Sequence, residues 1–145
     1  MAAACEGAAS SERYRDGDII GILPGFDPGA CNRWVDLPIA TGLDHVRNFL
    51  VANSDAVVAV GGGAGTLSEM AGAWQLKRLI CGYRTDGWSG RLADQPIDER
   101  VRYPDMPDDR VFGVDSADEV IKILAERLSR YTERHRGIGM QEASR

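Results

Sequence analysis

The chain has 145 residues, of which 43% are hydrophobic and 27% charged, enough to bury the core of one ordinary globular domain. Its 22 acidic residues outnumber the 17 basic ones, which gives a formal net charge of −5, and no Lys/Arg stripe marks a nucleic-acid interface. We therefore expect one domain over residues 1–135, a polar tail over 136–145 and a small ligand, with no nucleic-acid partner.

The cysteines and the apolar runs bear on the compartment. Cys5, Cys31 and Cys81 lie far apart without C-x-x-C or His-rich spacing, which argues against a disulfide framework and against a metal site. No apolar run approaches the ~18 residues of a membrane span, and the N-terminus has no secretory pattern. We expect a cytoplasmic protein that does not enter a membrane.

Helix and strand patterns alternate along the chain. In chain order we predict a helix over 1–15, a buried strand over 18–23, an edge strand near 35–37, a helix over 41–53, a strand over 57–60, a helix over 66–77, a strand over 79–83, a surface excursion over 84–110, a strand over 111–114 and a helix after Ser116. This alternation indicates an α/β protein with a parallel sheet flanked by helices.

Two of the predicted helices begin with an N-capping pattern. Thr41 can cap the helix over 41–53, whose apolar face would hold Leu43, Val46 and Leu50. The second start is a capping-box pattern, Ser116-Ala117-Asp118-Glu119, before a run of apolar residues at helical spacing. Both helices are expected to pack on the sheet.

The segment Gly61-Gly62-Gly63-Ala64-Gly65-Thr66 follows a predicted strand and leads into a predicted helix. Glycines let the backbone approach a ligand closely, and a helix start offers unpaired N–H groups, so this segment predicts a phosphate-binding loop. It is neither a P-loop, because no Lys follows, nor G-x-G-x-x-G, because Thr66 replaces the third glycine. Pro24-Gly25 also follows a strand, so we expect both turns to face one crevice.

Two charged residues near this loop have alternative interpretations. Glu69 follows Thr66 by three positions, so the pair is either a capping box or a carboxylate placed beside the sugar of a bound nucleotide. Arg47 lies at the edge of the predicted apolar helix face and needs either an anionic ligand or a local partner such as Asp44. The residues alone leave both alternatives open.

Beyond these features, Val60-Gly61-Gly62-Gly63-Ala64-Gly65-Thr66-Leu67-Ser68-Glu69 resembles the P-G-G-x-G-T-x-x-E motif of the "lonely guy" family, long labelled lysine decarboxylase. Arg47-Asn48 resembles the helical arginine of that family. The chain is most similar to a bacterial branch related to the molybdenum cofactor carrier protein, through the segments Ile20–Gly25, Thr41-Gly42, Gly61–Glu69, Gly87-Trp88 and Leu92-Ala93.

The resemblance implies a Rossmann-like fold, a homo-oligomer (dimer or tetramer), and cleavage of nucleoside 5′-monophosphates at the N-glycosidic bond in the catalytic relatives. Carried over, the phosphate would be held by Gly61, Gly62, Gly63, Gly65 and Thr66. Arg47 and Glu69 would form the catalytic pair, and Pro24, Gly25 and Asn48 would line the crevice. No metal is implied. The ligand would be a nucleoside monophosphate or molybdopterin, and no further cofactor is required.

The chain departs from the family at Val60, which replaces Pro, and at Asn48, which replaces Lys. We therefore expect ligand binding with more reason than catalysis. In the family a first βαβ, about forty residues by the size of such a unit, precedes the helix that here begins at Met1, so we expect an N-terminally truncated sequence. Three functions remain: a phosphoribohydrolase, a non-catalytic molybdenum cofactor carrier or nucleotide sensor, and a subunit that only oligomerises.

Overall fold

The computed structural model describes residues 1–132, and the predicted tail over 136–145 lies outside them. The chain divides into a first unit, Met1–Val51, and a second unit from Ala52 onward. Each unit contains its own parallel sheet, and no strand pairing joins the two sheets within residues 1–132. The α/β class with parallel strands is confirmed. The single domain expected over 1–135 stays a prediction.

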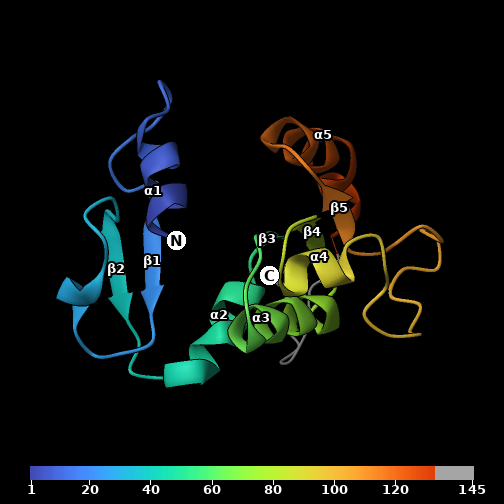
Figure 1. Ribbon diagram of the computed structural model, residues 1–145, viewed down its shortest axis with the longest axis horizontal. Coiled ribbons are helices and arrows are strands. Elements are labelled where there is room, and N and C mark those ends of the chain that lie inside the picture. The colour runs from blue at the N-terminus through green and yellow to red at the C-terminus, as the bar shows by residue number, and fades with distance from the viewer. Residues whose placement is uncertain (133–145) are drawn as a thin grey trace, which may run out of the picture. The chain divides into compact units, whose positions relative to one another are not determined.

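The first unit holds a two-stranded sheet (Figure 1). Its elements are α1 (Ala2–Ala9), β1 (Ile20–Leu23), a 3-10 turn (Pro28–Ala30), β2 (Leu37–Ala40), a 3-10 turn (Asp44–Arg47) and the start of α2 (Asn48–Ala52). β1 and β2 are parallel, with Ile20 opposite Leu37 and Leu23 opposite Ala40. Ile19 is buried, Ile20 is 56% exposed and the next three residues are half-buried, so the burial predicted for the first strand is only partly correct.

The first unit also corrects two predicted helices. α1 ends at Ala9 rather than near residue 15. The helix predicted over 41–53 is broken at its start, because Gly42 and Asp44 adopt left-handed backbone angles, φ 63° and 47°. Thr41 Oγ1 accepts a hydrogen bond from the Leu43 N–H and donates one to the Leu23 carbonyl, so it fixes the turn after β2 instead of capping a helix. The predicted apolar face is exposed: Leu43 45%, Val46 64% and Leu50 49%.

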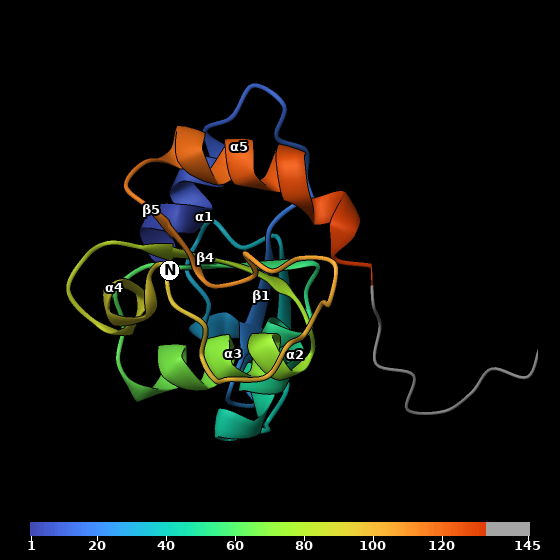
Figure 2. The same ribbon diagram turned by 90° about the vertical axis from the view of Figure 1, so that its right-hand side faces the viewer.

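The second unit is a three-layer arrangement (Figures 1 and 2). Its elements are β3 (Ala56–Ala59), α3 (Ala64–Gln75), β4 (Leu79–Tyr83), α4 (Trp88–Leu92), β5 (Phe112–Val114), α5 (Ala117–Arg127) and a 3-10 turn (Leu128–Arg130). The strands are parallel in the order β3-β4-β5, with α3 on one face of the sheet and α5 on the other. The central strand β4 is the one predicted over 79–83.

Alternation along β4 supplies both cores of the second unit. Ile80 points to the α3 face, where it packs with Met70 and Trp74, whereas Leu79 and Cys81 point to the opposite face. The predicted helix start at Ser116 is confirmed, since Ser116 Oγ accepts the Glu119 N–H, but the reciprocal bond of a capping box is shifted by one residue: Glu119 Oε2 accepts the N–H of Asp115 instead of Ser116.

The segment 84–110, predicted as a surface excursion, contains α4 and contributes to the core. Arg102, Tyr103 and Met106 are buried, and Tyr103 packs edge-on against the ring of Tyr131. Arg102 is buried as a paired charge, with Asp109 as its carboxylate partner. None of the helices within residues 1–132 is long and apolar enough to cross a membrane.

Candidate functional site

The glycine loop connects β3 to α3 at the carboxyl edge of the second unit's sheet. Gly61 and Gly62 adopt φ 61° and 88°, angles that residues with side chains rarely take. α3 then begins at Ala64, with Gly63 at the N-cap position and no side chain capping the helix. The helix therefore starts two residues before the predicted position.

This start overturns one interpretation of Thr66 and Glu69. Because Gly63 is the N-cap, Thr66 lies in the first turn of α3 and Glu69 in the second, so the pair is not a capping box. Thr66 instead lies over the loop, since a Cβ placed on Gly62 would overlap Thr66 Oγ1. Its hydroxyl is thus held beside the loop.

The backbone N–H groups of Gly62, Gly63, Ala64, Gly65 and Thr66 donate to no backbone carbonyl within residues 1–132. Gly62 through Gly65 are exposed, and a Cβ on Gly63 or Gly65 would meet no atom within 4 Å. The first turn of α3 carries no acidic residue. Five backbone N–H donors therefore lie together at the N-terminal end of α3, where the helix dipole favours an anion.

The loop between β4 and α4 lies against the glycine loop. A Cβ on Gly61 would lie 3.0 Å from the Asp86 carbonyl oxygen, and one on Gly87 would lie 2.6 Å from the Gly61 carbonyl carbon. Beside this contact the surface is hollowed by an open depression of ≈ 560 Å³. Its walls come from the β4–α4 loop, from α4 and from the residues just after it: Arg84, Thr85, Asp86, Gly87, Gly90, Arg91, Ala93 and Asp94.

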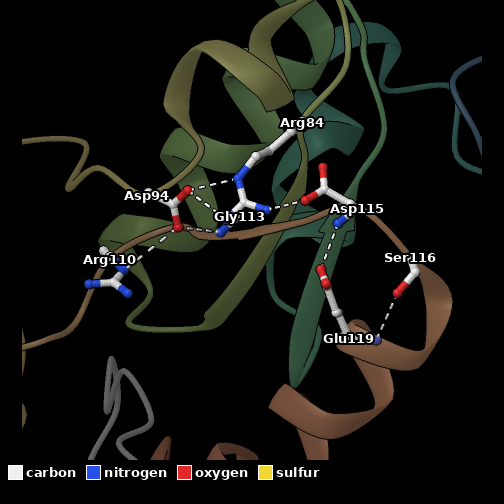
Figure 3. A network of polar contacts seen from close by, with 7 residues as sticks. All are labelled: Arg84, Asp94, Arg110, Gly113, Asp115, Ser116 and Glu119. Atoms are coloured by element: carbon white, nitrogen blue, oxygen red, sulfur yellow. Dashed lines mark hydrogen bonds and ion pairs between the residues drawn. The ribbon is translucent and has the colours of Figure 1, made fainter.

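A polar network borders the depression at the ends of β4 and β5 (Figure 3). Arg84 Nη2 lies 2.8 Å from Asp94 Oδ2 and Arg84 Nη1 lies 2.6 Å from Asp115 Oδ2. Asp94 also accepts the Gly113 N–H at 3.1 Å and lies 3.9 Å from Arg110 Nε. The network ties the segment after α4 to the carboxyl edge of the sheet.

Protonation in this network follows from its pairing. Burial alone would raise the pKa of the Asp94 carboxyl, but the hydrogen bonds from Arg84 and Gly113 and the charges of Arg84 and Arg110 bring it below its usual value. The hydrogen bond to Asp94 is the main reason that the pKa of Arg84 is raised. Both groups stay charged at neutral pH.

The remaining predicted site residues belong to the first unit. The Pro24 and Gly25 carbonyls accept the N–H groups of Asp44 and Gly42, at 3.0 and 2.9 Å, so both residues lie in one turn at the carboxyl ends of β1 and β2. Arg47 ends the second 3-10 turn and Asn48 is buried. The meeting of Arg47 with Glu69, which belongs to the second unit, stays a prediction.

Sequence reasoning named Gly87 only through the family resemblance, and it missed Ser89, Arg84, Asp94 and Asp115. The one available signal was Asp86-Gly87, a turn dipeptide directly after a predicted strand. Within residues 1–132 no group of three or more His, Cys, Asp or Glu side chains could hold a metal ion.

These features define a class: an α/β protein whose parallel strands end at a glycine loop and an open helix N-terminus. The match to the SLOG cluster4 family model covers residues 1–121, and the chain belongs to that family. This confirms the relationship to Rossmann-like lonely-guy proteins and molybdenum cofactor carriers.

Three proteins illustrate the relationship. An uncharacterized protein of Archaeoglobus fulgidus is 40% identical over 67 residues, which is 46% of this chain and 44% of that protein, less than half its length. The X-ray structure of TM1055 is similar with a TM-score of 0.67 and 28% identity, over 84% of this chain and 69% of the other. The molybdenum cofactor binding protein of Rippkaea orientalis has a TM-score of 0.65 and 31% identity, over 85% and 68%.

Proposed function

We propose that the chain binds a small phosphorylated ligand, with the phosphate at the N–H groups of Gly62 to Thr66. The observation that carries this proposal is the open start of α3, where five adjacent backbone donors lack backbone acceptors and no side chain occupies the N-cap. A phosphate satisfies such donors and gains from the helix dipole. The Thr66 hydroxyl, placed over Gly62, is available as a sixth donor.

The ligand class is tested by a matched pair of ligands. AMP and adenosine share the base and the sugar and differ only in the phosphate. If the phosphate is the recognised group, calorimetry with the full chain gives measurable binding of AMP and none of adenosine at the same concentration. Equal affinity for the two ligands would contradict the proposal.

A nucleoside 5′-monophosphate phosphoribohydrolase is the catalytic form of this function. Water would add to C1′ of the ribose as the N-glycosidic bond breaks, and the base would leave with a proton, giving free base and ribose 5-phosphate. Glu69, half-buried in the second turn of α3, would stabilise the positively charged sugar or orient water, and Arg47 would assist. We expect the protein to release adenine from AMP and the Glu69→Gln variant to release none. If the wild-type protein binds AMP but releases no adenine, the hydrolase is excluded.

The second candidate is a carrier of the molybdenum cofactor, or a nucleotide sensor, without catalysis. It is favoured by the likeness to the molybdenum cofactor binding protein of Rippkaea orientalis. The same N–H groups fit the phosphate of a pterin cofactor, and the exposed glycines leave room for its approach. Mass spectrometry of ligand released from the purified protein would find a pterin if the protein is a carrier; a bound nucleotide would count against that candidate.

A further inference from the structure

The start of α4 is hydrogen-bonded to the glycine loop. The Trp88 N–H donates to the Gly62 carbonyl at 3.0 Å and the Ser89 N–H donates to the Gly61 carbonyl at 3.1 Å. In return the Gly61 N–H donates to Ser89 Oγ at 2.7 Å, and the Ser89 hydroxyl donates to the Tyr83 carbonyl at 2.8 Å. Ser89 is completely buried, so one hydroxyl connects the glycine loop to the end of β4.

Backbone contact at Gly87 makes this junction tight. Gly87 adopts φ 113°, and a Cβ there would lie 2.6 Å from the Gly61 carbonyl carbon and 2.7 Å from the nitrogen and oxygen of Gly62. Only glycine therefore permits this approach. The junction leaves the glycine loop little freedom to turn.

The direction of the hydrogen bonds sets the direction of the free donors. In a trans peptide the C=O and the following N–H point to opposite sides. Because the carbonyls of Gly61 and Gly62 point to α4, the N–H groups of Gly62 and Gly63 point away from it. They are two of the five donors without backbone acceptors at the start of α3.

We propose that Ser89 is a positioning residue for the phosphate site: with Gly87 and the first N–H groups of α4, it holds the peptide planes of the loop so that Gly62 and Gly63 present their N–H groups to the ligand. This inference rests on the proposed phosphate-binding function for its ligand. The orientation of the loop itself is measurable without any ligand.

The test compares variants of the full chain. Ser89→Ala removes the hydroxyl, Ser89→Cys keeps a weaker donor and acceptor, and Tyr131→Phe removes a different buried hydroxyl, which donates to Asp109 at 2.6 Å. Two readouts are taken: hydrogen exchange of the Gly61 amide without ligand, and affinity for AMP and inorganic phosphate. Tyr131→Phe controls for a general loss of stability, because the ring packs with Leu79 and Phe112 and the hydroxyl donates to Asp109 and not to the glycine loop.

In Ser89→Ala we expect faster exchange at Gly61 and about ten-fold weaker binding, with Ser89→Cys intermediate, since one hydrogen bond is lost. Tyr131→Phe should lower the melting temperature and leave both readouts unchanged. If Ser89→Ala fails to fold, Ser89→Cys decides. Unchanged exchange at Gly61, or unchanged affinity in folded protein, would overturn the inference. A wild-type chain that binds neither AMP nor phosphate would refute the proposed function, while the exchange result would still decide the role of Ser89.

Discussion

Gly63 and Gly65 differ from the other two glycines of the loop in what surrounds them. A Cβ on Gly61 or Gly62 would meet neighbouring atoms, whereas one on Gly63 or Gly65 would meet none within 4 Å. Gly63 has φ −101°, which other residues share, and ψ −149°, which lies just outside the usual β range. The space around Gly63 therefore leaves room for a side chain as long as no ligand occupies it.

This separates binding from stability at one residue. Gly63→Asp places a side chain at the N-cap that accepts N–H groups of the first turn, and this new cap should offset the backbone strain. The free energy of unfolding should therefore change by less than about 1 kcal/mol. The affinity for AMP should fall at least about ten-fold, because the carboxylate occupies the position of the phosphate and repels its negative charge. Gly63→Asn is the matched control: it caps without charge and should weaken binding less. Undiminished AMP affinity in Gly63→Asp would be inconsistent with this site.

Asp94 provides a pH-dependent prediction. Its pKa is lowered in the folded protein, so its charge stabilises the fold above the unfolded value of about 3.9, and this contribution disappears as the pH falls through the folded value. The side chain is 42% exposed, so we expect less than about 1 kcal/mol. Asp94→Asn, which keeps a residue that tolerates φ 64°, should lower stability at pH 7 and leave it unchanged near pH 2. Urea unfolding at the two pH values measures this, and equal losses at both would refute it.

At the scale of elements, Arg102 joins the segment before β5 to the end of α3. Its guanidinium lies 3.6 Å from the Trp74 ring centroid and donates to the carbonyls of Trp74 and Arg78 at 3.2 and 3.1 Å. It also forms two hydrogen bonds with Asp109, at 2.8 and 2.7 Å, and both side chains are less than a tenth exposed. One guanidinium thus pairs with a buried carboxylate and also donates to carbonyl groups at the C-terminus of α3.

Breaking this junction should be costly. Arg102→Ala removes one partner of a buried pair and should lower the free energy of unfolding by about 3 kcal/mol, as measured in urea. The matched control is Arg100→Ala, in the same segment, whose side chain is 67% exposed and pairs with Asp98 at the surface; it should change stability little. Similar losses for the two variants would show that burial of the Arg102 pair does not matter.

Features set by residues close in sequence were predicted, and features set by residues distant in sequence were not. The strand over 79–83 was predicted correctly because an unbroken apolar run and its flanks are local signals. The helix over 41–53 was predicted correctly only in its second half, because Gly42 and Asp44 adopt left-handed angles while their N–H groups donate to Gly25 and Pro24, which are distant in sequence. The glycine loop was predicted, but its partner Ser89 was not, since a buried serine 28 residues away leaves no periodic pattern.

At the scale of the whole molecule, both units expose large apolar side chains. In the first unit Ile20, Leu37 and Ile39 are 49–56% exposed on neighbouring strands, and in the second Val58 of β3 is 44% exposed. Apolar sheet residues that remain exposed favour association between chains. The homo-oligomer and the cytoplasmic compartment expected from the sequence remain proposals.

Association is checked by the mass in solution. Light scattering of the full chain should give a dimer or a tetramer at micromolar concentration, and Val58→Lys, a charge on the exposed face of β3, should shift the mass toward the monomer if β3 takes part. Light scattering that gives a monomer for the wild-type chain at all concentrations would contradict the expected assembly.

The central claim, that a phosphate binds at the start of α3, is tested most directly by following individual backbone amides during a titration with AMP. The N–H signals of Gly62, Gly63, Ala64, Gly65 and Thr66 should shift together and saturate, while adenosine leaves them unmoved. Saturable shifts confined to other residues, or no shift at these five, would contradict the account.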